Sequence, residues 1–132
     1  MDNADRNYRW RKAREKRIAA QLCLEQGFFS ESVTLCYYAC YQGMWIAVGD
    51  PPAGLWRHGG LINEFCRGRW QRPPALPQTL APLRKKLDRL YVYRIRSDYE
   101  VQSLSEEEAQ EALDTVGEVF SIVSQHTGLK MQ

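Results

Sequence analysis

The stretch that decides the fold is LAPLRKKLDRLYVYRIRSDY, which runs from Leu80 to Tyr99. Leucines recur within it at alternating steps of three and four residues, at Leu80, Leu83, Leu87 and Leu90. This spacing places one apolar stripe along a helix. The next two positions on the same stripe, one helical turn apart, are Arg94 and Asp98.

Arg94 stands where the stripe calls for another leucine. A charge that is removed from water is costly unless it is paired or used. One interpretation is a local ion pair between Arg94 and Asp98 that closes the end of the helix. The other is a polar site between packed helices, where charged groups of a binding site tend to gather. The pattern alone leaves both interpretations open.

The chain before this stretch also predicts helices. We expect the first helix from about Arg9 to Gln26, with a basic first half that projects past the core. Ser30 is the expected cap of a second helix that is apolar or aromatic on nearly every face and ends before Asp50. Such a helix belongs at the centre of a bundle or in a subunit interface.

The middle and the end of the chain complete the expected fold. A short helix is anchored by Leu61, Ile62 and Phe65, and a proline-rich loop over residues 72–78 leads to the long helix over residues 79–99. Ser105 starts the last helix, and Glu108 three residues later completes a capping box. We therefore predict one all-α domain over residues 1–132, an antiparallel up-and-down bundle of four main helices plus a short helix.

The charges are balanced in number but uneven in position. The chain has 132 residues, with 18 Lys and Arg against 16 Asp and Glu. Basic residues crowd residues 1–17, and acidic residues crowd residues 100–118. This asymmetry fits a basic arm that contacts phosphate. It also fits the commoner case of solvated faces whose opposite charges align two helices or two subunits.

The cysteines and histidines indicate neither a metal site nor a secreted protein. The cysteines are Cys23, Cys36, Cys40 and Cys66, and we expect them to be buried free thiols. Neither His58 nor His126 has metal-ligand spacing to another histidine. The charged start differs from a secretory signal. We expect a cytoplasmic protein with no membrane segment, no metal and no cofactor.

Four segments, taken in order, resemble the HEPN family of small helical bundles, and specifically its small stand-alone prokaryotic members. They are residues 37–39 (YYA), 57–65 (RHGGLINEF), 90–99 (LYVYRIRSDY) and 105–120, which has an acidic start and Ala/Phe spacing. The resemblance covers the chain from about Ile18 to Val123. The basic start and the loop after Trp70 do not resemble the family.

The resemblance implies a helical bundle that pairs as a homodimer. It also implies a genomic partner, a minimal nucleotidyltransferase, in toxin–antitoxin or phage-defence modules. Many members are metal-independent endoribonucleases with an R-x4–6-H motif completed across the dimer cleft. In that motif the arginine binds phosphate and stabilises transition-state charge. The histidine acts as acid or base on the ribose hydroxyl or the leaving oxygen.

This chain departs from that motif. Counted from Arg94, the motif histidine is replaced by Tyr99, and the longer spacings fall on Glu100 and Val101. A tyrosine is a far poorer general base than imidazole at neutral pH. The candidate catalytic residues implied by the resemblance are therefore Arg94, Asp98 and Tyr99. His58 is a further candidate if its segment folds near the cleft, and otherwise it supports the start of the short helix.

The candidate nucleic-acid contacts are cationic. They are Arg94 and Arg96, together with Arg9, Arg11 and Arg14 of the basic start. Tyr37, Tyr38 and Tyr41 are either packing residues or a platform on which bases stack.

Three functions fit these features. The first is an RNA-binding, toxin-like protein with weak or altered ribonuclease activity. The second is a non-catalytic binding subunit of a nucleotidyltransferase. The third is a structural interaction module. Retention of Arg94 and Asp98 favours the first two over the third.

Overall fold

The computed structural model describes residues 1–99 and 103–131. These residues form five α-helices and one short 3-10 helix, and they include no strand. The elements are α1 (Asn3–Glu25), α2 (Phe29–Val48), α3 (His58–Arg67), η1 (Pro77–Leu80), α4 (Ala81–Tyr99) and α5 (Glu106–Thr127). The predicted all-α fold, with four main helices and a short one, is confirmed.

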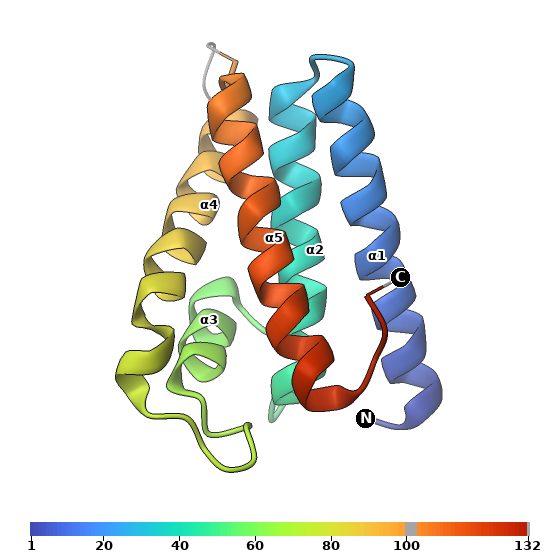
Figure 1. Ribbon diagram of the computed structural model, residues 1–132, viewed down its shortest axis with the longest axis vertical. Coiled ribbons are helices and arrows are strands. Elements are labelled where there is room, and N and C mark those ends of the chain that lie inside the picture. Colours follow the sequence, from blue (N-terminus) through green and yellow to red (C-terminus); the bar gives the residue numbers. More distant parts are fainter. Residues whose placement is uncertain (100–102, 132) are drawn as a thin grey trace.

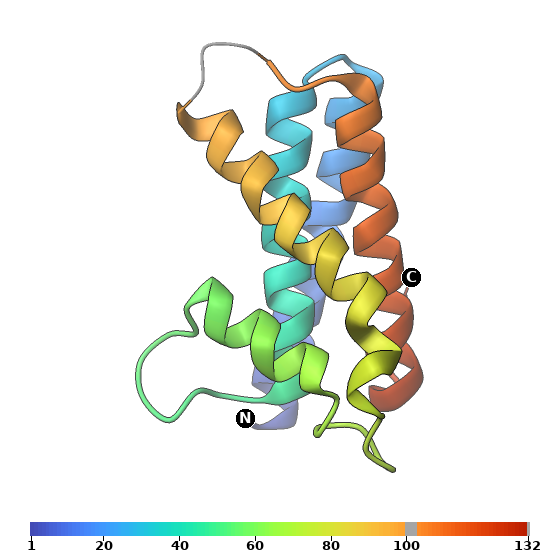
Figure 2. The same ribbon diagram turned by 90° about the vertical axis from the view of Figure 1, so that its left-hand side faces the viewer.

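The long helices run alternately up and down, with α2 in the centre (Figure 1). α2 packs against α1, α3, α4 and α5, which confirms its predicted place at the centre of the bundle. Figure 2 shows α4 crossing α2 at an angle, with α3 below it at one end of the bundle. α1 and α4 lie on opposite sides of α2 and do not pack against each other.

The predicted apolar faces form the core. All the leucines of the stripe are buried, as are the expected anchors of α3, namely Leu61, Ile62 and Phe65. The predicted inward face of α5 is also buried, at Ala109, Ala112, Leu113, Val116, Phe120 and Val123. Removing these side chains from water is the main source of the stability of the bundle.

The start of α5 has the predicted capping box. The backbone N–H of Glu108 donates to the Ser105 hydroxyl at 3.1 Å, and the backbone N–H of Ser105 donates to the Glu108 carboxylate at 2.9 Å. Two backbone donors that a helix start leaves unpaired are thereby satisfied.

The predicted start of the first helix was wrong. α1 begins at Asn3, with Asp2 as its cap, and its first half packs against the bundle through two buried residues. Trp10 is only 3% exposed and Ala13 is fully buried. The Trp10 indole donates to the backbone carbonyl of Lys130 at 2.6 Å, and its ring lies 4.8 Å from that of Phe120. Partners at the far end of the chain, which local periodicity does not reveal, bury this segment.

Two further boundaries also differ from the prediction. α2 starts at Phe29, so Ser30 is not its cap; instead the Ser30 hydroxyl accepts from the backbone N–H of Leu104 at 3.3 Å. The loop predicted over residues 72–78 ends at residue 76, where η1 takes over and leads into α4. Before this loop, Gly68 ends α3 at φ 72°, and a Cβ there would lie 2.9 Å from the Cβ of Ala75. Only glycine fits this turn.

The acidic face of α5 pairs with the basic residues of α4. Three ion pairs form this α4/α5 seam: Lys86–Glu118 at 2.5 Å, Arg96–Glu108 at 2.7 Å, and Arg89–Glu111. Opposite charges therefore do align two helices, as the commoner interpretation held. The cations involved belong to α4, however, and not to the basic start of the chain.

Most of the cations of α1 lie near aromatic rings. Among the described residues no basic side chain of α1 forms an ion pair. Arg9 lies 3.7 Å from the Trp45 ring centroid, and Arg17 lies 5.4 Å from that of Phe120. These cation–π contacts hold the side chains in place but leave their charge uncompensated.

No helix in the described part of the chain combines the length and the apolar character that crossing a membrane requires.

Candidate nucleic-acid interface

Arg94 sits on the face of α4 that packs on α2, where it has one hydrogen bond and two rings as neighbours. Its guanidinium donates to the Tyr38 hydroxyl at 3.0 Å. The same group lies 5.1 Å from the ring centroid of Tyr37 and 5.5 Å from that of Tyr38. Its Nε is shielded from solvent and has no hydrogen-bond partner among the described residues. Arg94 is thus a partly buried cation with unused donor capacity.

The predicted pair with Asp98 exists but is loose. Arg94 Nε lies 3.5 Å from Asp98 Oδ2, too poorly aligned for a hydrogen bond. The contact is therefore Coulombic, and it lacks the two-pronged geometry that makes arginine–carboxylate pairs strong. Each interpretation of Arg94 is therefore partly right: Arg94 forms a local pair with Asp98, and it also faces polar and aromatic groups of a neighbouring helix.

A line of rings connects Arg94 to α3. Tyr37 packs edge-on against Tyr38, with centroids 5.1 Å apart, and lies 5.9 Å from Tyr91. The Tyr91 ring in turn stacks on His58, at a centroid distance of 3.5 Å and an angle of 12°. We call Arg94, Tyr37, Tyr38, Tyr91 and His58 the Arg94 cluster.

The loop between α2 and α3 places His58 at this position. The Tyr41 hydroxyl donates to the backbone carbonyl of Trp56, and the Trp56 indole donates to that of Gly49 at 2.8 Å. These two bonds hold Trp56, near the end of the loop, against α2 and its C-cap. His58 is the first residue of α3 and is half-buried.

The imidazole of His58 is held in its neutral form. Burial lowers its pKa from the usual value, the positive charge of Arg94 lowers it further, and Asp88 has a smaller opposite effect. A histidine with a lowered pKa is uncharged at neutral pH, so it can accept a proton or a hydrogen bond. The structure therefore brings His58 within the electrostatic reach of Arg94.

Tyr37 belongs to the packing of the cluster. It is buried, and burial raises the pKa of its hydroxyl despite the opposite effect of Arg94. Tyr38 and Tyr91 are half-buried and keep part of their rings accessible. Of the predicted tyrosine platform, Tyr38 is the ring that is both accessible and bonded to Arg94.

Tyr99, which stands in the place of the motif histidine, is the last residue of α4 and is 80% exposed. Five helical residues separate it from Arg94 by roughly 140° around the helix axis. Asp98, four residues from Arg94, shares its face. The alternative motif positions, Glu100 and Val101, lie outside the described residues.

Arg96 is tied to the opposite side of α4. It belongs to the α4/α5 seam through Glu108 and lies 5.7 Å from the Tyr93 ring centroid. Ser105 and Arg96 hydrogen-bond to Glu108 and lower the pKa of its carboxyl, so the partner is fully charged at neutral pH. Arg96 and Arg94 therefore point to different neighbours although they are two residues apart.

The predicted contacts on α1 are divided between two sides of that helix. Arg9 stacks on Trp45 and donates to the Gln42 side chain at 2.9 Å. Arg11 and Arg14 line a groove between α1 and α5. None of the three is brought together with Arg94, and their role in nucleic-acid binding stays a prediction.

Two residues of the site were missed in the sequence. Lys16 of α1 lies with its Nζ 5.9 Å from the ring centroid of Tyr38, so a second cation approaches the same ring as Arg94. Tyr91 links His58 to the cluster. Tyr91 is three residues before Arg94, a spacing that puts both on one helix face and could have identified it. Lys16 belongs to the basic start that was predicted to contact phosphate, but nothing in the local sequence singles it out.

The cysteine thiols are not members of the Arg94 cluster. Cys36, Cys40 and Cys66 are buried and free, as predicted, whereas Cys23 is only half-buried. Burial raises the pKa of Cys36 to about 12 and also raises that of Cys40, so both are unreactive. In the described residues, no group of three or more His, Cys, Asp or Glu side chains is arranged to hold a metal ion.

Comparison with known proteins identifies one family. The family model of the HEPN domain matches residues 65–126, from the last turn of α3 to the last turn of α5. Arg94, Asp98 and Tyr99 lie inside the matched segment, and His58 and the tyrosines of α2 lie before it. No curated protein matches the chain.

Proposed function

On the premise that the chain belongs to the HEPN domain family, we propose that it binds single-stranded RNA at the Arg94 cluster and cleaves it slowly or not at all. The observation that carries this proposal is Arg94 itself. It is a partly buried cation with a shielded Nε that makes no hydrogen bond among the described residues, and its ion pair with the Asp98 carboxylate, at 3.5 Å, is loose. Guanidinium groups with free donors are well suited to bind the phosphates of RNA.

The surroundings of Arg94 support RNA as the ligand. Lys16 supplies a second positive charge over the ring of Tyr38. The accessible parts of Tyr38 and Tyr91 offer aromatic faces on which an unpaired base can stack. Phosphate contacts combined with stacking are the usual way in which proteins hold single strands.

The proposed weakness of cleavage follows from the groups available for proton transfer. Tyr99 replaces the motif histidine, and a phenol is a far poorer general base than an imidazole. His58 is the group best suited to take a proton from a ribose 2′-hydroxyl, because its imidazole is neutral. Arg94 would stabilise the charge that develops on the phosphate as the 2′-oxygen attacks phosphorus.

The proposal also includes a twofold homodimer, which in this family completes the cleft. Mass from light scattering at micromolar protein concentration tests it, and a monomer mass would count against it. A partner nucleotidyltransferase encoded nearby, in a toxin–antitoxin or defence module, is a further part of the proposal that rests on the family alone.

In a second candidate function, the chain is not itself an enzyme but is modified by a partner nucleotidyltransferase. It is favoured by the exposure of Tyr99, whose hydroxyl is accessible to another enzyme at the end of α4. Its oxygen would attack the α-phosphorus of a nucleoside triphosphate, which would leave a nucleotide on the tyrosine and release pyrophosphate. Mass spectrometry of the chain co-expressed with the neighbouring gene tests this, with Tyr99→Phe as the control.

The experiment for RNA binding compares two arginines of one helix. Fluorescence anisotropy with a labelled single-stranded RNA should show binding that weakens steeply as salt is added. Arg94→Ala should weaken binding about tenfold or more, because a charge-assisted bond to phosphate is lost. Arg96→Ala removes the same charge two residues away and should change binding far less. Equal losses in the two variants would place the binding site elsewhere.

A further inference from the structure

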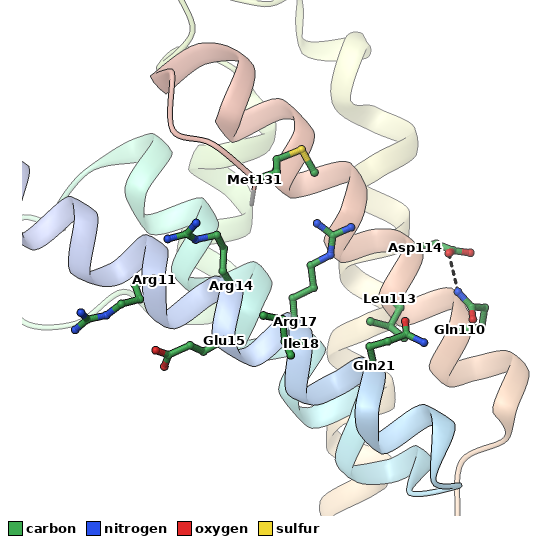
Figure 3. A pocket seen from close by; sticks show the side chains of 10 residues that line it. All are labelled: Arg11, Arg14, Glu15, Arg17, Ile18, Gln21, Gln110, Leu113, Asp114 and Met131. Carbon is green, nitrogen blue, oxygen red and sulfur yellow. Dashed lines mark hydrogen bonds between the residues drawn. The ribbon is translucent and has the colours of Figure 1, made fainter.

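A groove with a different character lies on the other side of the molecule, between α1 and α5. It has a volume of about 690 Å³. Its α1 wall carries Arg11, Arg14, Ile18 and Gln21, which recur at steps of three and four residues and therefore form one stripe of the helix. Its α5 wall carries Gln110, Leu113 and Asp114 (Figure 3).

Two arginines point into this groove. Figure 3 shows the side chains of Arg14 and Arg17 rising from α1 toward α5 and the C-terminal segment, whereas those of Arg11 and Glu15, which also line the groove, extend in another direction. Neither Arg14 nor Arg17 forms an ion pair within the described residues. Asp114, the acid on the opposite wall, accepts instead from the Gln110 amide at 3.0 Å.

Arg14 has a donor that the fold leaves unused. Its Nε is shielded from solvent and has no hydrogen-bond partner among the described residues. A donor that has lost water without gaining a partner costs free energy. Arg17 is held above the ring of Phe120, so its guanidinium is fixed in position while its charge remains uncompensated. Glu15 and Asp114 also line the groove, but among the described residues neither forms an ion pair with Arg14 or Arg17, so both guanidinium groups can bind an external anion.

Part of the groove wall is apolar. Leu113 and Met131 line it, together with Ile18, which is 62% exposed although it is a large aliphatic residue. The volume falls within the range of roughly 300–1,000 Å³ that is usual for small-molecule sites. A ligand that fits has an anionic group for the arginines and an apolar portion for this wall.

We propose that the α1/α5 groove is a second anion site that binds a phosphate ester with an apolar body. Two guanidinium groups one turn apart provide two positive charges. A phosphate monoester has nearly two negative charges at neutral pH, whereas a carboxylate has one. The planar fork of arginine also fits phosphate oxygens in pairs.

This site is separate from the Arg94 cluster. α1 and α4 lie on opposite sides of α2 and make no contact. The two sites also use different faces of α1, since Lys16 rests on Tyr38 of α2 while Arg14 and Arg17 face α5. The proposal therefore stands or falls independently of the RNA-binding function.

The test uses phenyl phosphate as the probe, with inorganic phosphate and benzoate for comparison. Binding to the full chain is followed by NMR titration of backbone amides. Phenyl phosphate should bind most tightly, inorganic phosphate less, and benzoate least, with shifts centred on α1 and α5. Arg14→Gln combined with Arg17→Gln should weaken phenyl phosphate binding at least about tenfold, because charge-assisted bonds are lost.

Three controls separate this result from a general charge effect. Lys12→Gln combined with Lys85→Gln removes two charges outside the groove lining and should leave binding unchanged. Arg94→Ala should also leave it unchanged. Ile18→Ser should weaken binding of phenyl phosphate but not of inorganic phosphate. Unchanged helical circular dichroism checks that each variant is folded.

Several results would overturn the proposal. They are no binding of phenyl phosphate at millimolar concentration, equal loss in the groove variant and the charge-matched control, and benzoate binding as tight as phenyl phosphate. Loss of phenyl phosphate binding in Arg94→Ala alone would assign the anion to the Arg94 cluster instead.

Discussion

The two faces of α4 use arginine in opposite ways. Toward α5, the cations of the helix meet carboxylates, and each member of the α4/α5 seam has a charged partner. Toward α2, Arg94 meets tyrosine rings and a hydroxyl, and its one acid, Asp98, is only loosely paired. The faces belong to the same helix and share similar basic residues.

The difference lies in what the neighbouring helix provides. α5 begins with an acidic face, so the charges of the seam are neutralised where the two helices meet. α2 is apolar and aromatic, and a ring attracts a cation without cancelling its charge. A cation packed against rings keeps a positive field that can act on a ligand, whereas a cation in the seam serves to align helices.

The largest expected effect is a gain of RNA cleavage. Tyr99→His restores an imidazole at the motif position, and a positioned general base contributes about a hundredfold or more to rate. RNA cleavage should therefore rise in the variant. The rise should vanish in Arg94→Ala and persist in Arg96→Ala, both made in the Tyr99→His background. Vigorous metal-free cleavage by the wild type that survives Arg94→Ala would show that the active site lies elsewhere.

The second prediction separates binding from stability at Arg94. Arg94→Leu completes the apolar stripe of α4, so the melting temperature should stay level or rise. RNA binding should nevertheless fall about tenfold or more with the loss of the phosphate contact. Thermal unfolding and anisotropy measured on the same preparation check both results. A stable Arg94→Leu protein with unchanged binding contradicts the role given to Arg94.

The third prediction concerns the strength of the pairs on the two faces. A double-mutant cycle with Arg96→Ala and Glu108→Ala should give a coupling of about 0.5–1 kcal/mol, as expected for a partly exposed pair. The side chains are 31% and 23% exposed. The same cycle for Arg94 and Asp98 should give less, because their atoms are 3.5 Å apart and unbonded. Urea unfolding measures both coupling free energies. Equal values would contradict the proposed difference between the two faces of α4.

The smallest expected effect is a pH dependence of the free energy of unfolding that comes from His58. Its pKa in the folded chain is lowered, while that of the unfolded chain is about 6.5. As pH falls below this value, the unfolded state takes up the proton more readily, so His58 lowers the free energy of unfolding. The wild type should thus lose more stability than His58→Asn between pH 7.5 and 5.5. Parallel curves for the two proteins would show that Arg94 and burial do not act on His58.

Much of this fold could be predicted because its signals are local. The leucine stripe, the capping box at Ser105 and the apolar α2 each depend on residues within a few turns of one another. The start of α1 could not be predicted in this way. Trp10 and Ala13 are separated by charged residues, and Trp10 is buried by Phe120 and the backbone of Lys130.

The candidate site also has a part that the sequence predicts and a part that it does not. The position of Arg94 on the stripe and its Asp98 neighbour are both visible in the spacing of one helix. The partners that give Arg94 its surroundings come from α2, and His58 comes from α3. The packing angle of the helices decides which cation faces a ring and which faces an acid, and the sequence does not encode that angle locally.

The bond from Trp10 to the backbone of Lys130 joins residues 120 positions apart. During synthesis on a ribosome, α1 and α2 can pair as soon as both have emerged, but Trp10 gains its full cover only when Phe120 of α5 and the segment after α5 are available. Until then, α1 presents an indole and a row of cations on one surface. A nascent chain at this stage therefore exposes an indole that the finished protein buries.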